Sequence, residues 1–303
     1  MSAAVIALDA MGGDRAPAEL VAGALRARNE YGVQVVLVGR EREVARALEV
    51  ADDPGGLEIV DAGDVVGNDE DPAVGVRGKP RASIRVAAEL VAAGRAGALV
   101  SAGSTGATLA TALLTLRRLH GVRRPVVAAV LPIGAQGVVL VDAGASADPQ
   151  PEALVAHSRM GVAYAQVRGV PLPRVGLLNM GTEAGKGNAF TRTAHDLLTR
   201  EPAFVGNVEP GGVHDGVVDV VVTDGFTGNV FLKTVEAVMP DRDPGAGPGA
   251  AILLGVDGAV LVAHGAARER EIAAALRTAA QVAGSGLAQR IEERLADLLA
   301  DPT

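Results

Sequence analysis

The chain has 303 residues, with Lys+Arg 28 against Asp+Glu 36 for a net charge of −8, aromatic residues at 2% and no cysteine. The lack of cysteine excludes disulfides, thiolate metal sites and a cysteine nucleophile, and the negative charge argues against general nucleic-acid binding. The N-terminal residues show no signal-peptide pattern, and no apolar run approaches the ~20 residues of a membrane-spanning helix, so we expect a cytoplasmic location.

Short apolar runs alternate with helix-forming segments along the whole chain. The apolar runs predict buried strands at residues 4–8, 33–38, 57–60, 98–101, 125–131, 138–141, 175–178, 204–208, 217–222, 251–255 and 259–263. Helical spacing predicts helices at residues 17–29, 40–48, 81–93, 107–119, 151–167, 189–199, from 229 onward, and 271–299 with an interruption at 284–286. Residues 67–80 are predicted to be irregular, and residues 239–250 to form a Pro/Gly-rich break. The alternation predicts a single α/β domain over residues 1–303, with a mostly parallel sheet and helices on both faces.

Polar loops that contain glycine follow many of these strands. They lie at residues 9–14, 101–106, 142–148, 179–188, 223–229 and 264–265. Parallel strands bring such loops to one edge of a sheet, the edge where ligands bind in open α/β folds. For the loops at 9–14 and 101–106, an equally good interpretation is an ordinary turn, capped by Asp14 and by a serine or threonine respectively. The candidate binding residues in these two loops are Asp9, Gly12, Gly13, Ser101, Gly103, Ser104 and Thr105.

The loop at 179–188 carries the strongest signal for an anion site. Its three glycines let backbone N–H groups approach an anion, and Lys186 adds a compact positive charge. The helix predicted from residue 189 places its N-terminus at the same point, which also favours an anion. The alternative is an ordinary strand-to-helix loop. Lys186 is one of three lysines in the chain, with Lys79 and Lys233, and Lys233 shares a predicted helix face with Asn229.

The chain resembles the phosphate acyltransferases that make acyl-phosphate from acyl-acyl carrier protein, the PlsX family. The motifs that carry the resemblance are DAMGGD at 9–14, SAGSTGA at 101–107, VDAGAS at 141–146, GLLNMGTEAGKGN at 176–188, FVGNVE at 204–209, TDGFTGNVFLKT at 223–234 and LLGVDG…AHG at 253–265. The resemblance implies an isocitrate/isopropylmalate dehydrogenase-like α/β fold and a homodimer. It also implies transfer of a fatty acyl group from acyl carrier protein to orthophosphate, with the product used in phospholipid synthesis.

Such a transfer needs no nucleophile from the enzyme, because phosphate itself attacks the thioester. We expect neither a cofactor nor a metal. The protein must position the phosphate and stabilise the oxyanion that develops on the thioester. We assign these tasks to Lys186, Lys233, Asn188 and Asn229, with Asn179 and Asn207 as supporting donors. Asp224 or Glu183 would orient a lysine, and His264 would protonate the leaving thiol. His157 and His195 are interpreted as structural residues.

A basic cluster at residues 117–124 is the predicted docking surface for the acidic carrier protein. It consists of Arg117, Arg118, Arg123 and Arg124. The alternative is a solvated surface with no partner.

Three features depart from the family pattern. Ser104 and Ser146 stand where we expect asparagine, the segment 236–250 is shorter than the family's apolar tip, and no Gly-Arg-Asp follows Glu209. The shortened tip weakens the expectation of peripheral membrane contact and of long-chain specificity.

Three alternatives therefore remain: a phosphotransacetylase-like enzyme that uses acyl-CoA, a dehydrogenase of the same fold, and a non-catalytic homologue that binds partners as a dimer. The dehydrogenase is disfavoured because the chain has no strand-linked GxGxxG motif and no acidic metal cluster.

Overall fold

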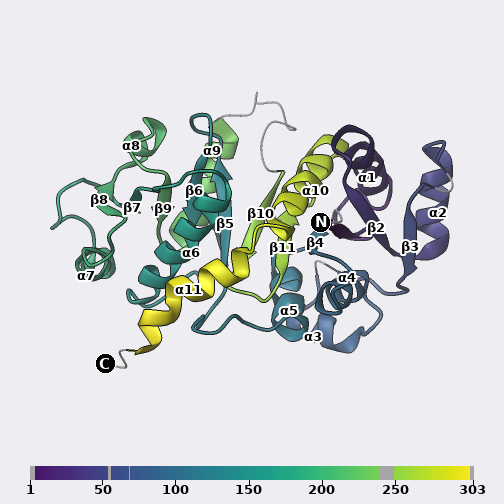
Figure 1. Cartoon of the computed structure of the whole chain (residues 1–303), viewed down its shortest axis with the longest axis horizontal. Coiled ribbons are helices and arrows are strands. Elements are labelled where there is room, and N and C mark those ends of the chain that lie inside the picture. The colour runs from purple at the N-terminus through teal and green to yellow at the C-terminus, as the bar shows by residue number, and fades with distance from the viewer. Residues whose placement is uncertain (1–3, 54–55, 68, 239–248, 301–303) are drawn as a thin grey trace. The chain divides into compact units, whose positions relative to one another are not determined.

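The computed structural model (Figure 1) describes residues 4–53, 56–67, 69–238 and 249–300. The described chain divides into two compact units. The first contains residues up to Arg118 and those from 249 to Gly286, and the second contains Leu119 to residue 238 and the residues after Gly286. The expectation of a single folding domain stays a prediction.

The first unit is built on a mostly parallel set of strands. Their order is β3 (Glu58–Asp61), β2 (Gln34–Gly39), β1 (Val5–Asp9), β4 (Ala98–Ser101), β11 (Ala259–Ala263) and β10 (Ala250–Leu254). Only the β10–β11 pair among them is antiparallel. In the register of the parallel strands, Ser101 lies opposite both Asp9 and Val262. The loops that leave β1, β4 and β11 therefore meet at one edge of the sheet, as the sequence predicts.

Helices flank these strands in the first unit. They are α1 (Ala18–Tyr31), α2 (Glu41–Val50), α3 (Pro72–Gly78), α4 (Ser83–Ala92), α5 (Thr105–Thr115) and α10 (Glu269–Ala283). Figure 1 shows α1 beside α10, and α3, α4 and α5 grouped together. The contact between α1 and α10 requires Gly23, because a Cβ atom there would lie 2.5 Å from Cβ of Ile272.

The second unit is also built on a mostly parallel set of strands with helices beside them. Their order is β5 (Val126–Leu131), β6 (Val138–Val141), β9 (Val220–Val222), β7 (Val175–Leu178) and β8 (Phe204–Val208), and only β5–β6 is antiparallel. Its helices are α6 (Ala153–Val167), α7 (Ala189–Leu198), α8 (Pro210–His214), α9 (Gly225–Val238) and α11 (Leu287–Ala300). The central strands β6, β9 and β7 are short, fully buried apolar runs, which is typical of parallel sheets that are covered on both faces, whereas β8 at the edge is only partly buried.

A partly buried ion pair fixes the C-terminal helix to the second unit. The guanidinium of Arg159 on α6 makes two hydrogen bonds of 2.9 Å to the carboxylate of Glu201. Its third nitrogen donates to the carbonyl oxygen of Arg294 on α11 at 2.8 Å. This fork geometry satisfies the guanidinium and explains why α11 packs along α6.

The structure corrects the predicted elements most clearly at one missed helix and at three element ends. Residues 67–80 contain helix α3, which starts with Pro72 and is capped by Asp71 accepting from the amide of Val74 at 2.9 Å. The sequence prediction missed it because α3 spans only seven residues. Helix α5 ends at Thr115 rather than 119, because Arg117 adopts a left-handed conformation with φ 70°.

The other two corrections concern α9 and β9. Helix α9 begins at Gly225, one turn before the predicted start, because Asp224 accepts a hydrogen bond from the amide of Thr227. Strand β9 begins at Val220 rather than at residue 217. Residues 239–248 of the predicted break at 239–250 lie outside the described residues. No helix in the described ranges is long and apolar enough to cross a membrane.

His157 gives the second unit a specific sensitivity to acid. It lies on α6, is 2% exposed, and its Nδ1 atom has no hydrogen-bond partner among the described residues. Burial lowers the pKa of His157 from 6.5 to about 4. The unfolded chain therefore takes up a proton at this histidine below about pH 6.5, whereas the folded chain does so only near pH 4.

We predict that this difference costs roughly 3 kcal/mol of unfolding free energy as the pH falls from 6.5 to 4. Denaturant unfolding at several pH values should show a flatter dependence in His157→Leu than in the parent. The exposed His120, replaced by glutamine, controls for the loss of a histidine. An unchanged slope in His157→Leu would mean that other groups cause the acid sensitivity.

Candidate active site

The loop between β7 and α7 has its backbone fixed at several points. Asn179, the first residue after β7, donates from its amide nitrogen to the carbonyl oxygen of Lys186 at 3.2 Å and accepts from the amide of Met180 at 2.8 Å. Arg192 on α7 donates to the carbonyl oxygen of Gly187 at 2.6 Å. Gly187 itself has φ +92°, and a Cβ atom there would lie 2.1 Å from the hydroxyl of Thr191, so only glycine fits.

A second set of bonds holds the middle of the same loop. Asn207 on β8 donates from Nδ2 to the carbonyl oxygen of Glu183 at 2.8 Å, and its Oδ1 lies 3.0 Å from Nδ1 of His195. The amide of Lys186 donates to the same Glu183 carbonyl at 3.0 Å. The carbonyl oxygen of Glu183 thus accepts two hydrogen bonds, one from a backbone amide and one from a side chain, and together they hold the turn from Glu183 to Lys186.

The side chain of Lys186 contrasts with its backbone. It is 51% exposed, and its ammonium makes only a long contact of 3.9 Å with the carboxylate of Glu183, which is 67% exposed. An exposed pair at this separation contributes little free energy. The ammonium therefore extends from an anchored backbone and remains able to bind an anion.

The predicted donors Asn179, Asn188 and Asn207 have structural partners in this geometry. Asn188 caps α7, with its Oδ1 accepting from the amide of Thr191 at 2.9 Å. The amide nitrogens of Asn179 and Asn207 point at loop carbonyls. All three side chains shape the loop that presents Lys186, and their assignment as substrate donors stays a prediction.

The neighbouring strands contribute a second cluster in the same unit. Asn229 on α9 donates from Nδ2 to the carbonyl oxygen of Ala143 at 3.0 Å, which ties α9 to the loop after β6. Asp224 accepts from the amide and the hydroxyl of Thr227, at 2.8 Å and 2.7 Å, and so acts as a helix cap. Lys233 is exposed one turn beyond Asn229 and forms no ion pair within the described part of the chain.

Asp142 organises this cluster, and it was absent from the predicted site. It is fully buried, and its carboxylate accepts four backbone N–H groups at 2.8–3.1 Å, from Val127, Gly144, Ala145 and Ser146. Burial raises the pKa of Asp142, and these four donors oppose the rise. An aspartate that follows a buried strand and precedes small residues is the sequence signal that could have identified it.

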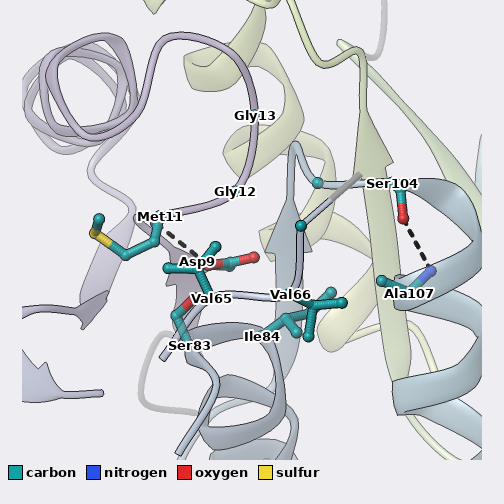
Figure 2. Close-up of a pocket in the computed structure, with 12 residues that line it drawn as sticks. Asp9, Met11, Gly12, Gly13, Val65, Val66, Ser83, Ile84, Ser104 and Ala107 are labelled. Carbon is teal, nitrogen blue, oxygen red and sulfur yellow. Dashed lines mark hydrogen bonds between the residues drawn. The ribbon is translucent and has the colours of Figure 1, made fainter. Parts of the chain in front are cut away.

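The first unit contains a cavity of about 170 Å³ at the edge where β1 and β4 end (Figure 2). Its wall combines the carboxylate of Asp9, the hydroxyls of Ser83 and Ser104, the glycines 12, 13 and 103, and apolar side chains such as Ile84. None of the described residues that line it is a lysine or an arginine. The cavity therefore differs chemically from the lysine-bearing loop of the second unit.

Asp9 is the buried polar centre of this wall, with 2% exposure. Its carboxylate accepts from the hydroxyl of Ser101 at 2.7 Å and from the amide of Met11 at 3.3 Å. Burial raises the pKa of Asp9, while the hydrogen bonds from Ser83 and Ser101 oppose the rise. Gly12 must lack a side chain, because a Cβ atom there would lie 2.6 Å from the Asp9 carboxylate.

The remaining predicted residues of the first unit lie near the same sheet edge. Ser104 caps α5, with its hydroxyl accepting from the amide of Ala107 at 3.1 Å, and Thr105 is the first residue of that helix. The amide of Asp14 donates to the carbonyl oxygen of Gly265 at 2.8 Å, which brings the loop of His264 to the loop of β1. Asp14 does not cap a helix, because α1 starts only after Pro17.

The predicted sites are therefore divided between the units. His264 and the 9–14 and 101–106 loops belong to the first unit, whereas Lys186, Lys233, Asn229 and Asp224 belong to the second. Arg117 and Arg118 belong to the first unit, and Arg123 and Arg124 belong to the second. All four side chains are exposed. Lys79, the third lysine, is held in the first unit by Glu70 and by the carbonyl oxygen of Val65.

Comparison with known proteins shows that the chain is similar to relatives named phosphate acyltransferase. The family model described as "Fatty acid synthesis protein" matches residues 4–241. Phosphate acyltransferase of Desulfitobacterium hafniense (strain Y51) is 42% identical, with 96% of this chain and 97% of the relative covered. Phosphate acyltransferase of Gloeobacter violaceus is 41% identical, with 96% of each chain covered.

Solved structures share the fold at lower sequence identity. A phosphotransacetylase from Streptococcus pyogenes matches with a TM-score of 0.70 and 21% identity over 92% of this chain and 93% of that chain. A 4-hydroxythreonine-4-phosphate dehydrogenase from Klebsiella pneumoniae matches with a TM-score of 0.56 and 17% identity over 93% and 98%. These likenesses confirm the predicted α/β fold class.

Proposed function

Because the chain belongs to the family of fatty acid synthesis proteins, we propose that it is a phosphate acyltransferase that moves a fatty acyl group from acyl-acyl carrier protein to orthophosphate. The observation that carries this proposal is the 42% identity, over 96% of the chain, to a relative named phosphate acyltransferase. The acyl-phosphate product would enter phospholipid synthesis.

The reaction balances without a covalent enzyme intermediate. An oxygen of orthophosphate bonds to the thioester carbonyl carbon, the carbon–sulfur bond breaks, and the sulfur leaves and takes a proton. The protein contributes positioning of the phosphate and stabilisation of the negative charge that develops on the carbonyl oxygen. A chain without cysteine can perform both tasks.

Lys186 is the residue that we assign to the phosphate. Its backbone is anchored through the carbonyls of Glu183, Lys186 and Gly187, whereas its ammonium is exposed. Anchoring limits the conformational entropy that is lost when the lysine binds a ligand, which favours preorganised binding. Lys233, which is exposed beyond Asn229, is the proposed second cation.

The partners follow from surface chemistry. The four exposed arginines at 117–124 are the proposed contact for the acidic carrier protein. Helix α9 exposes the large apolar side chains of Phe226, Val230 and Val238, which supports burial of this helix in a homodimer. Peripheral membrane contact is the alternative use of such an apolar surface.

The first test is a turnover assay with purified protein and long-chain acyl-acyl carrier protein, in which acyl-phosphate is trapped as its hydroxamate. We expect trapping that depends on added orthophosphate. A parallel assay supplies the same acyl group as its CoA thioester. Faster trapping with acyl-CoA than with acyl-acyl carrier protein would favour the phosphotransacetylase-like alternative. Folded protein that traps no product with either donor would favour the non-catalytic alternative.

Replacement of Lys186 tests its role in the transfer. We expect Lys186→Met to lower turnover by ~10²-fold or more, the scale that follows removal of a charge-stabilising donor. Lys79→Met is the matched control, because Lys79 is bonded within the first unit, and it should change turnover by less than about threefold. Near-normal turnover in Lys186→Met, with an unchanged melting temperature, would exclude Lys186 from the mechanism.

Charge reversal tests the carrier-protein contact. We expect the double variant Arg123→Glu with Arg124→Glu to raise KM for acyl-acyl carrier protein about tenfold, because the acidic carrier protein loses its positive contact. Added salt should also raise this KM in the parent protein, because it screens the same attraction. Arg42→Glu with Arg46→Glu on α2 makes the same change in net charge elsewhere on the surface. Equal KM values in the two double variants would show that net charge, and not this cluster, determines carrier binding.

A further inference from the structure

A chain of hydrogen bonds connects a buried histidine to the backbone of the lysine loop. His195 lies on α7 and is 9% exposed, with its ring packed edge-on against Phe204 at a centroid distance of 5.3 Å. Its Nδ1 atom lies 3.0 Å from Oδ1 of Asn207 on β8, and Nδ2 of Asn207 donates to the carbonyl oxygen of Glu183. This series of hydrogen bonds thus starts at the buried His195 and ends within the loop that carries Lys186.

The chemistry of the acceptors fixes the orientation of both side chains. A carbonyl oxygen can only accept, so the Asn207 group that faces Glu183 must be the NH₂ group. Oδ1 of Asn207 then faces His195, and the histidine must carry its proton on Nδ1 in order to donate. The Glu183 carbonyl therefore selects the amide orientation of Asn207, and this orientation selects the tautomer of His195 that donates from Nδ1.

The end of this chain coincides with the turn that sets the position of Lys186. The carbonyl oxygen of Glu183 accepts from Asn207 Nδ2 at 2.8 Å and from the amide of Lys186 at 3.0 Å. Without Asn207, the Glu183 carbonyl keeps only the second bond, while Asn179 and Arg192 still hold the carbonyls of Lys186 and Gly187. The backbone of Lys186 would then sample a wider range of positions.

We propose that His195 and Asn207 are positioning residues that hold the Glu183–Lys186 turn in the conformation that places the Lys186 ammonium for orthophosphate. This inference rests on the proposed function of Lys186. It predicts an effect on phosphate binding and on turnover, with little effect on binding of the thioester donor, because the bonds end at the backbone of the lysine loop.

The test uses one variant that breaks both bonds and two variants that break one. Asn207→Leu removes both. Asn207→Asp keeps the acceptor for His195 but turns an oxygen toward the Glu183 carbonyl, and His195→Phe keeps the ring and removes the donor. His195→Gln restores a donor and is the conservative rescue. Phe204→Leu is the matched control, because it disturbs the packing of His195 without removing either hydrogen bond.

Two readouts separate positioning from general destabilisation. Amide hydrogen exchange at residues 181–187, measured in the full chain, should speed up at least about tenfold in Asn207→Leu and Asn207→Asp, and not in Phe204→Leu. In steady-state assays, KM for orthophosphate should rise about tenfold in the same two variants, while KM for the thioester stays within about twofold. His195→Gln should fall between His195→Phe and the parent in both readouts.

The outcomes that would overturn the proposal are distinct from those that would overturn the function. Unchanged exchange at residues 181–187 in Asn207→Leu would show that the bonds do not hold the turn. Faster exchange with an unchanged phosphate KM would show that the turn does not position the phosphate-binding group. A parent protein without turnover would refute the proposed function, and the exchange experiment would still decide whether His195 and Asn207 hold the loop.

Discussion

Every loop that leaves the carboxyl end of a buried strand must find partners for its backbone N–H and C=O groups, and the structure depends on how this is achieved. In the second unit, the buried carboxylate of Asp142 accepts four backbone amides. In the first unit, Asp9 accepts from Met11 and from the buried hydroxyl of Ser101. An unsatisfied buried polar group costs ~1–3 kcal/mol, so these short acidic and amide side chains determine the shape of the polar loops.

This constraint separates two kinds of polar residue around the candidate site. Asn179, Asn188 and Asn207 use their amide groups on backbone partners, whereas Lys186 leaves its ammonium in solvent. The separation is physically reasonable, because a charged group that must bind and release an anion should not be tied into a permanent ion pair. A fixed backbone with an exposed cation gives positional accuracy without the desolvation cost of a buried charge.

The sequence predicted most strands and helices well, but it predicted the roles of the asparagine side chains less well. Strands such as β4 and β6 are continuous apolar runs with few alternatives, so both were predicted to the residue. Helix α3 was missed because seven residues are too few for helical periodicity to appear. An asparagine beside glycines can point at a ligand or at a loop carbonyl, and only the three-dimensional structure distinguishes the two. Asp142 was also not predicted as a site residue, because the four backbone amides from residues 127–146 meet at its carboxylate only in the folded structure.

The two serines that depart from the family pattern bear on whether the chain has lost its activity. Ser104 caps α5 through its hydroxyl, and serine and asparagine are about equally good caps, so this exchange preserves the helix start. Ser146 acts through its backbone, since its amide donates to Asp142 and its carbonyl accepts from Gly225, both at 2.8 Å. Those bonds do not depend on the side chain at position 146. Because both positions keep the interactions that organise the Asp142 loop and the cavity wall, the substitutions weigh little in favour of a non-catalytic homologue.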